Sequence, residues 1–293
     1  MNPKIFIAVG AYAPVEPHVY SNHVMWSALE SKKLRDTGIQ FGFQCWARTP
    51  LITFRNEAAE FAFKGDPEDF THLMFIDDDL KLELDGPSVI ARLLNASRDG
   101  VGAAVVHTRA WPYFPMVWRE DRMEIDGKMQ RLFGPVLSWE KGEELVVDAV
   151  SLACAMIRVD LLKKLFETHH APFWSWYKKS DDIHFGRIAR LAGATIRVDT
   201  TIQTIHMGRK QEIGRKLFRD TLPEAEADPE RVKRTLGCHV LPLEEGPPVC
   251  SATCSGPPDA RARERFARRR PTPARVAWAR RRRSTVFRSP WSR

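Results

Sequence analysis

Short apolar segments alternate with amphipathic segments through the first 110 residues of the chain. The apolar runs predict β-strands, and the segments between them, whose apolar residues recur at helical spacing, predict helices. The predicted strands are Ile5–Val9, Ile39–Cys45, Leu73–Ile76 and Val101–Val106. The predicted helices are His23–Leu34, Leu51–Phe63 and Pro87–Ala96. This β-α-β-α order predicts an α/β fold, with a mainly parallel sheet flanked by helices.

Residues 109–147 interrupt this alternation, because they are rich in Trp, Pro, Met and charged residues. We expect an excursion from the sheet there, such as a hairpin over a site. Apolar patterning then returns at Val146–Leu165. The remaining predicted elements are a helix at Asp182–Leu191, strands at Ala194–Val198 and Ile202–Ile205, and a last helix at Lys210–Phe218.

The composition changes near residue 220, which divides the chain into a domain of residues 1–219 and a tail of residues 220–293. Residues 240–293 hold 13 Arg, no Lys, 8 Pro and only 4 acidic residues. The rest of the chain is nearly neutral, so the net charge of +8 comes from the tail. A segment of this composition cannot easily bury a core, and we expect it to be disordered. Readthrough or a frameshift in a GC-rich gene is an alternative origin for it.

Several broad classes are excluded by composition. Apolar residues make up 43% of the chain, which is enough to bury a sizeable core. Five Cys in 293 residues do not form a disulfide scaffold. The apolar stretch at Ile5–Val9 is too short for a signal peptide, and no run is long enough for a membrane span. We therefore expect a cytoplasmic protein without an integral membrane segment.

The strongest chemical feature is the run Asp77-Asp78-Asp79 at the end of the predicted strand Leu73–Ile76. In an open α/β sheet, ligands bind at the carboxyl ends of the strands. Three adjacent carboxylates repel each other, and a divalent cation would compensate them with its preference for oxygen ligands. The alternative is an acidic turn that caps the next helix.

Two further motifs carry candidate chemistry. Asp181 and Asp182 open a predicted helix after an aromatic segment, where a partly desolvated carboxylate suits general-base work on a hydroxyl. Capping of that helix by Ser180 or Asp181 is the alternative. His206 follows a predicted strand, and a neutral imidazole can complete the shell of a metal such as Mn²⁺.

The order of these motifs resembles the nucleotide-sugar glycosyltransferases of the GT-A fold, in particular glycosyltransferase family 2 and its viral and microbial relatives. Those enzymes carry an Asp-x-Asp motif after a buried strand, then an acidic pair at a helix start, then a His near the end of the catalytic domain. Here the matching positions are Asp77-Asp78-Asp79, Asp181-Asp182 and His206. The flanking segments Val147–Val150, Met156–Arg158 and Ala192–Ile196 are also similar. The resemblance covers residues 3–215.

The resemblance implies metal-dependent transfer of a sugar from a nucleoside-diphosphate donor to the hydroxyl of a saccharide or other acceptor. It implies that Asp79 binds Mn²⁺ or Mg²⁺, that His206 is a further ligand, and that Asp77 contacts the ribose or the metal shell. Asp182, with Asp181 beside it, would take the acceptor proton. One base on the face opposite the leaving group implies inversion.

The remaining candidate residues concern the two substrates. Asp78, Arg55 and Tyr12 are candidates for the nucleotide side, and a guanidinium such as that of Arg55 suits phosphate oxygens. An ordinary surface ion pair is the alternative for Arg55, and packing is the alternative for Tyr12. The aromatic residues that could stack on an acceptor sugar are Trp174, Trp176 and Tyr177.

Three other interpretations of the sequence stay open. A nucleotidyltransferase on a similar sheet would also place carboxylates and metal at strand ends. A nucleic-acid-binding protein could act through its Arg-rich tail, although the neutral body makes nucleic acid an unlikely partner outside non-specific contacts with the tail. A weaker alternative is a zinc site from Cys238, His239, Cys250 and Cys254, whose spacing matches no standard pattern.

Overall fold

The structure is a computed structural model of the 293-residue chain. It describes residues 2–11, 14–64, 70–125, 128–140, 142–169, 171–173, 180–208, 211–228, 231 and 240–242. Several predicted features lie outside these residues, namely Tyr12, Trp174, Trp176, Tyr177, the possible zinc ligands and the tail beyond residue 242. For these features the interpretations above stay predictions.

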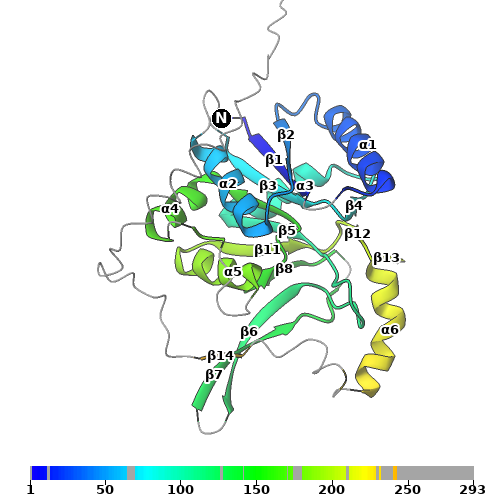
Figure 1. The fold of residues 1–293 in the computed structure, drawn as a ribbon, viewed down its shortest axis with the longest axis vertical. Helices are drawn as coiled ribbons and strands as arrows, with labels where there is room; N and C mark the ends of the chain where they lie inside the picture. Colours follow the sequence, from blue (N-terminus) through cyan, green and yellow to red (C-terminus); the bar gives the residue numbers. More distant parts are fainter. Residues whose placement is uncertain are drawn as a thin grey trace, which may run out of the picture. The chain divides into compact units, whose positions relative to one another are not determined.

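The described residues form a seven-stranded central sheet in the order β2-β1-β3-β10-β5-β11-β8 (Figure 1). Its strands are β1 (Lys4–Ala11), β2 (Gln40–Ala47), β3 (His72–Asp77), β5 (Gly100–Ala104), β8 (Glu144–Val147), β10 (Cys154–Arg158) and β11 (Thr195–Asp199). Strands β1, β2, β3, β5 and β11 share one direction, whereas β10 and β8 run antiparallel to their neighbours. The predicted α/β class with a mainly parallel sheet is therefore confirmed.

Helices cover both faces of this sheet. They are α1 (Pro17–Lys33), α2 (Leu51–Lys64), α3 (Val89–Ala96), α4 (Val159–His169) and α5 (Asp181–Leu191), with a short 3₁₀ turn at Ser97–Asp99. Helix α6 (Arg215–Ala227) packs instead against the segment around Phe114. Successive side chains of a strand point to opposite faces, so each strand feeds two cores. In β1, Phe6 and Ala8 pack with α2, α4 and α5, whereas Ile5 and Ile7 pack with α1 and α3.

Two smaller sheets extend the central one. Strand β12 (Thr204–Met207) lies between β4 (Leu80–Leu82) and β13 (Glu212–Ile213). The other sheet is built on a hairpin of β6 (Val117–Ile125) and β7 (Lys128–Pro135), with β9 (Ala149–Val150) and β14 (Val240–Pro242) at its edges. The hairpin expected within residues 109–147 is therefore confirmed (Figure 1).

Two helices begin several residues away from their predicted starts. Helix α1 begins at Pro17, six residues before the predicted start at His23, because Pro suits the first turn of a helix. The last helix begins at Arg215, since Glu212–Ile213 pairs with β12 and Gly214 has an extended backbone. Helix α6 continues through residue 219, where the sequence suggested a domain boundary, and that division stays a prediction.

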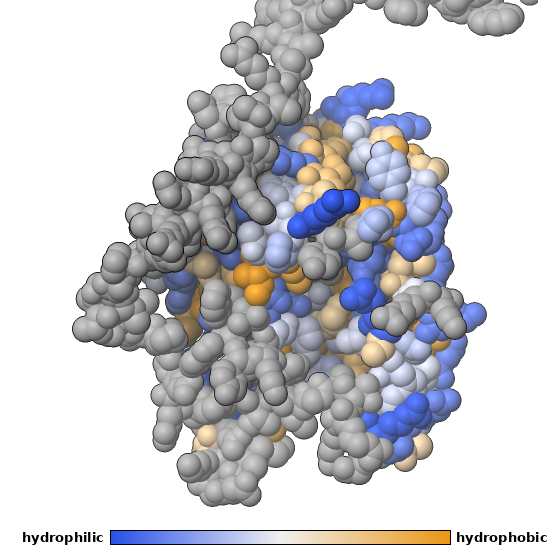
Figure 2. Space-filling view, in the orientation of Figure 1, coloured by the Kyte–Doolittle hydropathy of each residue, from blue (hydrophilic) through white to orange (hydrophobic). Residues whose placement is uncertain are grey.

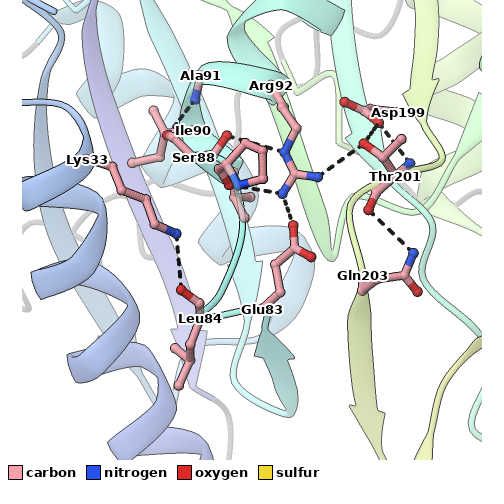
Figure 3. Close-up of polar contacts among 12 residues, drawn as sticks. Lys33, Glu83, Leu84, Ser88, Ile90, Ala91, Arg92, Asp199, Thr201 and Gln203 are labelled. Carbon is pink, nitrogen blue, oxygen red and sulfur yellow. Dashed lines mark hydrogen bonds and ion pairs between the residues drawn. The ribbon is translucent and has the colours of Figure 1, made fainter. Parts of the chain in front are cut away.

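A polar network connects α3 with α1 and with the segment that follows β11. The buried Glu30 carboxylate accepts hydrogen bonds from Ser88 Oγ and from the first backbone amides of α3. Arg92, on α3, pairs with Glu83 and donates to Thr201 Oγ1 at 3.1 Å (Figure 3). A carboxylate at a helix N-terminus is favoured both by the free amides and by the helix dipole.

Hydrophobic and hydrophilic residues are interspersed on the molecular face shown in Figure 2. The exposed large apolar side chains of α1 are Tyr20, Val24 and Met25.

In the part of the chain that the structure describes, none of the helices combines the length and the apolar character needed to cross a membrane.

Candidate active site

The acidic run lies where β3 leaves the central sheet. Asp77 is the last residue of β3, pairs in register with Gly10 of β1, and donates its amide to the Ala153 carbonyl at 2.9 Å. The next element is strand β4, so the alternative of an acidic turn that caps a helix is wrong. The carboxylates of Asp77 and its neighbours therefore project from the carboxyl end of a central strand, as predicted for a ligand site.

Asp79 and His206 face each other across the β4–β12 pairing. His206 Nε2 lies 3.2 Å from Asp79 Oδ1, and Nδ1 donates to the His107 carbonyl at 2.6 Å. Burial lowers the pKa of His206, but the hydrogen bond and charge of Asp79 outweigh it and raise that pKa above its usual value. Burial would raise the pKa of Asp79, yet the bond and charge from His206 hold it below the usual range. Both shifts favour the charged forms of the two side chains.

Arg109 adds a second cation to Asp79. Its Nη1 donates to Asp79 Oδ2 at 2.7 Å, and the guanidinium side chain is otherwise 62% exposed. Asp78 is only partly buried, and its pKa is raised to about 6 by burial and by the charges of Asp79 and Asp77. The negative charge of Asp79 is therefore stabilised by His206 and Arg109, whereas the negative charge of Asp78 is incompletely compensated.

Arg55 lies at the centre of the site, on the face of α2 that covers the sheet. Only 2% of its side chain is exposed, and its guanidinium bonds with both Asp181 and Asp182 through Nη1. Its Nη2 lies 3.8 Å from Asp77 Oδ1. The alternative of an ordinary surface ion pair is therefore wrong, because the guanidinium is buried among three carboxylates from β3 and α5.

Asp182 is held from two directions at the start of α5. Its Oδ1 accepts from Arg55 Nη1 at 2.9 Å and from the Leu152 amide at 3.1 Å. Ser180 caps the helix, with its Oγ accepting from the Asp182 amide at 3.3 Å. The capping role is thus confirmed for Ser180 and leaves both carboxylates to other partners. No residue of the described ranges donates a hydrogen bond to Asp182 Oδ2.

Burial makes Asp182 a basic carboxylate. Burial raises its pKa to about 7, and the charges of Asp181 and Asp77 act in the same direction, whereas Arg55 and the Leu152 amide lower it. Burial likewise raises the pKa of Asp77 against the opposing charge of Arg55. A carboxylate with a pKa near neutrality is suited to accept a proton from a hydroxyl.

The residues around Asp79 fit a divalent cation that binds together with a substrate phosphate. A carboxylate and an imidazole are suitable ligands, and the bond from His206 Nδ1 to the His107 carbonyl is the outer hydrogen bond that orients metal-binding histidines. Asp77 Oδ1 is buried without a hydrogen-bond partner. Within the described ranges, no three His, Cys, Asp or Glu residues form a group that could hold a metal. Cations such as Mg²⁺ often take one or two protein ligands and complete their shell with water and phosphate.

The structure thus brings together the residues predicted from β3, α5 and β12, together with Arg55 from α2. It also reveals two groups that sequence reasoning missed. Arg109 follows strand β5 in the irregular segment, and its charge alone does not indicate that it lies beside Asp79. Leu152 contacts Asp182 through its backbone amide, and a backbone contact cannot be predicted from the residue type.

Comparisons with known proteins find structural but not sequence relatives. No protein-family model matches the chain, and no curated protein matches its sequence. Among solved structures, protein A197 from STIV is 13% identical and has a TM-score of 0.41, with 70% of this chain and 85% of that chain covered.

Two glycosyltransferases are also among the similar structures. GalNAc-T7, solved with UDP, GalNAc and Mn²⁺, is 12% identical with a TM-score of 0.39, and the match covers 76% of this chain and 48% of that chain. A mutant of Drosophila β1,4-galactosyltransferase 7, in complex with manganese, UDP-Gal and xylobiose, is 14% identical with a TM-score of 0.32, covering 68% and 64%. The TM-scores of these three structures all lie below 0.5, so their likeness to the chain carries no argument about its family or activity.

Proposed function

We propose that the protein is a glycosyltransferase that moves a sugar from a nucleoside-diphosphate donor to an acceptor hydroxyl. One observation supports the proposal: Arg55 lies between Asp77, two residues before the Asp79–His206 pair, and Asp182, a buried carboxylate with a raised pKa. Glycosyl transfer needs these two functions side by side, because charge must be stabilised on the leaving group while a proton is removed from the nucleophile.

The donor binds on the β3 side of the site. Asp79 and His206 would hold Mn²⁺ or Mg²⁺, and Asp77 and Asp78 contact the ribose or complete the metal shell. When bound, the cation supplies Lewis-acid neutralisation of the negative charge on the departing diphosphate. The enclosure of Arg55 by carboxylates disfavours contact of its guanidinium with the diphosphate.

The acceptor binds on the α5 side, where none of the described residues donates a hydrogen bond to Asp182 Oδ2. The acceptor oxygen attacks the anomeric carbon and forms the new C–O bond as its proton passes to Asp182. The bond from the anomeric carbon to the diphosphate oxygen breaks, and its electron pair leaves with the nucleoside diphosphate. Attack opposite the leaving group inverts the anomeric configuration. Stacking of the acceptor on Trp174, Trp176 and Tyr177, and contact of Tyr12 with the nucleotide, stay predictions.

The full-length protein tests the proposal in two stages. Its thermal unfolding midpoint is measured with a panel of nucleoside diphosphates, with and without Mn²⁺, since a ligand that binds the folded state raises the midpoint. We expect a metal-dependent rise with one nucleotide. The matching nucleotide sugar is then incubated with candidate acceptors, and the released product is identified. Release of nucleoside diphosphate supports glycosyl transfer, release of pyrophosphate indicates a nucleotidyltransferase, and no shift with any nucleotide contradicts both.

A further inference from the structure

Arg55 is a cation with only 2% of its side chain exposed. The carbon at the centre of its guanidinium lies 6.0 Å from the centre of the Phe75 ring. Removing a guanidinium from water costs several kcal/mol, which only close and well-oriented counter-charges offset. A buried Arg that serves no purpose in the site could be replaced by an apolar residue of similar volume, so its charge calls for an explanation.

The counter-charges of Arg55 come from the two halves of the proposed site. Nη1 bonds with Asp181 and Asp182, at the start of α5, where the acceptor would bind. Nη2 lies 3.8 Å from Asp77 Oδ1, at the end of β3, where the donor would bind. A guanidinium is planar and rigid, so its nitrogens lie at a fixed separation. One side chain therefore lies between the two carboxylates, bonded to the acceptor carboxylate and in charge contact with the donor carboxylate.

We propose that Arg55 is a positioning residue that fixes the base Asp182 relative to the donor-side Asp77, and so aligns the acceptor oxygen with the anomeric carbon. This inference rests on the proposed glycosyl transfer. The geometry is specific about the oxygen involved, because Arg55 and the Leu152 amide both bind Asp182 Oδ1. Oδ2 is thereby directed to the acceptor, and Arg55 acts through Asp182 without touching either substrate.

A direct contact between Arg55 and the diphosphate is the competing role. The structure disfavours it, because Nη1 already bonds with two carboxylates and only 2% of the side chain is exposed. Phosphate oxygens approaching this guanidinium would also meet the negative charges of Asp77, Asp181 and Asp182. The two roles differ in what they predict: a positioning residue affects kcat, whereas a diphosphate contact affects nucleotide affinity.

The experiment uses two variants of the full-length protein. Arg55→Lys keeps the positive charge but loses the planar guanidinium with its fixed nitrogen positions, and Arg55→Gln loses both. Arg92→Lys is the matched control, because Arg92 is also a paired arginine on a helix but touches none of the proposed site residues (Figure 3). Each protein is characterised by its unfolding midpoint, by calorimetric titration with nucleoside diphosphate and Mn²⁺, and by kcat and KM.

We expect Arg55→Lys to lower kcat by about 10²-fold, the loss typical of a misplacement of about 1 Å in a reacting group. Nucleotide affinity should stay within about threefold of the parent, because the donor side keeps Asp79 and His206. Arg92→Lys should leave kcat unchanged. In Asp182→Asn protein, addition of Arg55→Lys should cause no further loss of rate, since the group that Arg55 positions is already gone.

Arg55→Gln adds an electrostatic readout. The groups that face Asp182 are Arg55 of α2, Asp181 of α5, Asp77 of β3 and the Leu152 amide. Arg55 is the cation among them. Loss of that cation favours the protonated carboxyl, so the acidic limb of the kcat profile should move to higher pH in Arg55→Gln. It should move much less in Arg55→Lys, which keeps the charge.

Several outcomes would overturn the inference. Unchanged kcat in Arg55→Lys contradicts a positioning role, as do additive losses in the double variant with Asp182→Asn. A fall in nucleotide affinity with kcat preserved assigns Arg55 to the diphosphate instead. If neither Arg55 variant folds, the guanidinium serves the fold and the inference is wrong. If the parent protein neither binds nucleotide nor transfers sugar, the proposed function itself is wrong. That result is distinct from the outcomes above, which concern only the variants.

Discussion

His206 Nε2 lies 3.2 Å from Asp79 Oδ1, although the two residues are far apart in the chain. The contact is produced by sheet pairing, because His206 of β12 is in register with Leu80 of β4 and the Met207 amide donates to the Asp79 carbonyl at 2.7 Å. The His107 carbonyl holds the other ring nitrogen. Backbone hydrogen bonds thus place an imidazole and a carboxylate side by side before any ligand arrives.

Asp79→Ala should therefore abolish metal-dependent binding of nucleotide. We expect the affinity measured by calorimetry with Mn²⁺ to fall by more than about tenfold, because even outer-shell changes at metal sites cost about 10–100-fold. The unfolding midpoint in the absence of ligand should change little. The matched control is Asp85→Ala, which removes an exposed carboxylate from the segment after β4. Equal nucleotide affinity in Asp79→Ala and parent protein would refute the role of Asp79.

Glu30→Ala should destabilise the protein without touching the site. The change leaves Ser88 Oγ and the Val89 and Ile90 amides without the carboxylate that now accepts their hydrogen bonds. Loss of a helix cap together with buried unpaired donors costs about 2–3 kcal/mol, so the midpoint should fall by several degrees. The measurement is denaturant or thermal unfolding followed by circular dichroism.

The control for this prediction is Glu60→Ala. Glu60 is exposed on α2 and forms only a surface pair with Lys64 at 3.4 Å, for which we expect a change below about 1 kcal/mol. If Glu30→Ala and Glu60→Ala destabilise the protein equally, the buried carboxylate is not the clamp between α1 and α3 that its contacts indicate.

Strands β1, β3 and β5 could be predicted from the sequence because they are buried on both faces. Leu73–Ile76 is an uninterrupted apolar run, and the structure extends it only to His72–Asp77. Strand β4 was missed because its three residues, Leu80–Leu82, form a strand only through pairing with β12. The late start of α6 has the same origin, since β13 also pairs with β12. Short strands defined by distant partners leave no periodic pattern in the sequence.

The candidate site could be predicted as a set of residue types but not as an arrangement. Asp79, Asp182 and His206 were selected by their chemistry and order, and the structure brings them into one region, while their roles stay predictions. Arg55 was read as a phosphate contact or a surface pair, because a helix sequence does not show what faces it. Its burial depends on carboxylates supplied by α5, more than a hundred residues later. Arg109 was missed because it lies in an irregular segment.

Asp182→Asn should nearly abolish transfer while leaving donor binding intact. An amide of the same shape can keep the contact with Arg55 but cannot accept the acceptor proton, and loss of a general base commonly costs about 10²–10⁴ in rate. Calorimetry with nucleoside diphosphate and Mn²⁺ should give the parent affinity, because Asp182 lies on the acceptor side of Arg55. An Asp182→Asn enzyme with ordinary turnover would sink the assignment of the base.

The pH dependence of kcat follows from the same carboxyl. Burial raises the pKa of Asp182 to about 7, against the opposing charge of Arg55. Since the base works only when ionised, kcat should fall as the pH drops through that value, by about tenfold per pH unit on the acidic limb. The measurement is kcat at saturating donor, acceptor and Mn²⁺ from about pH 5 to about pH 9, with the unfolding midpoint recorded in each buffer to exclude acid unfolding. A kcat that stays constant down to about pH 5 would show that a carboxyl in this environment is not the proton acceptor of the rate-limiting step.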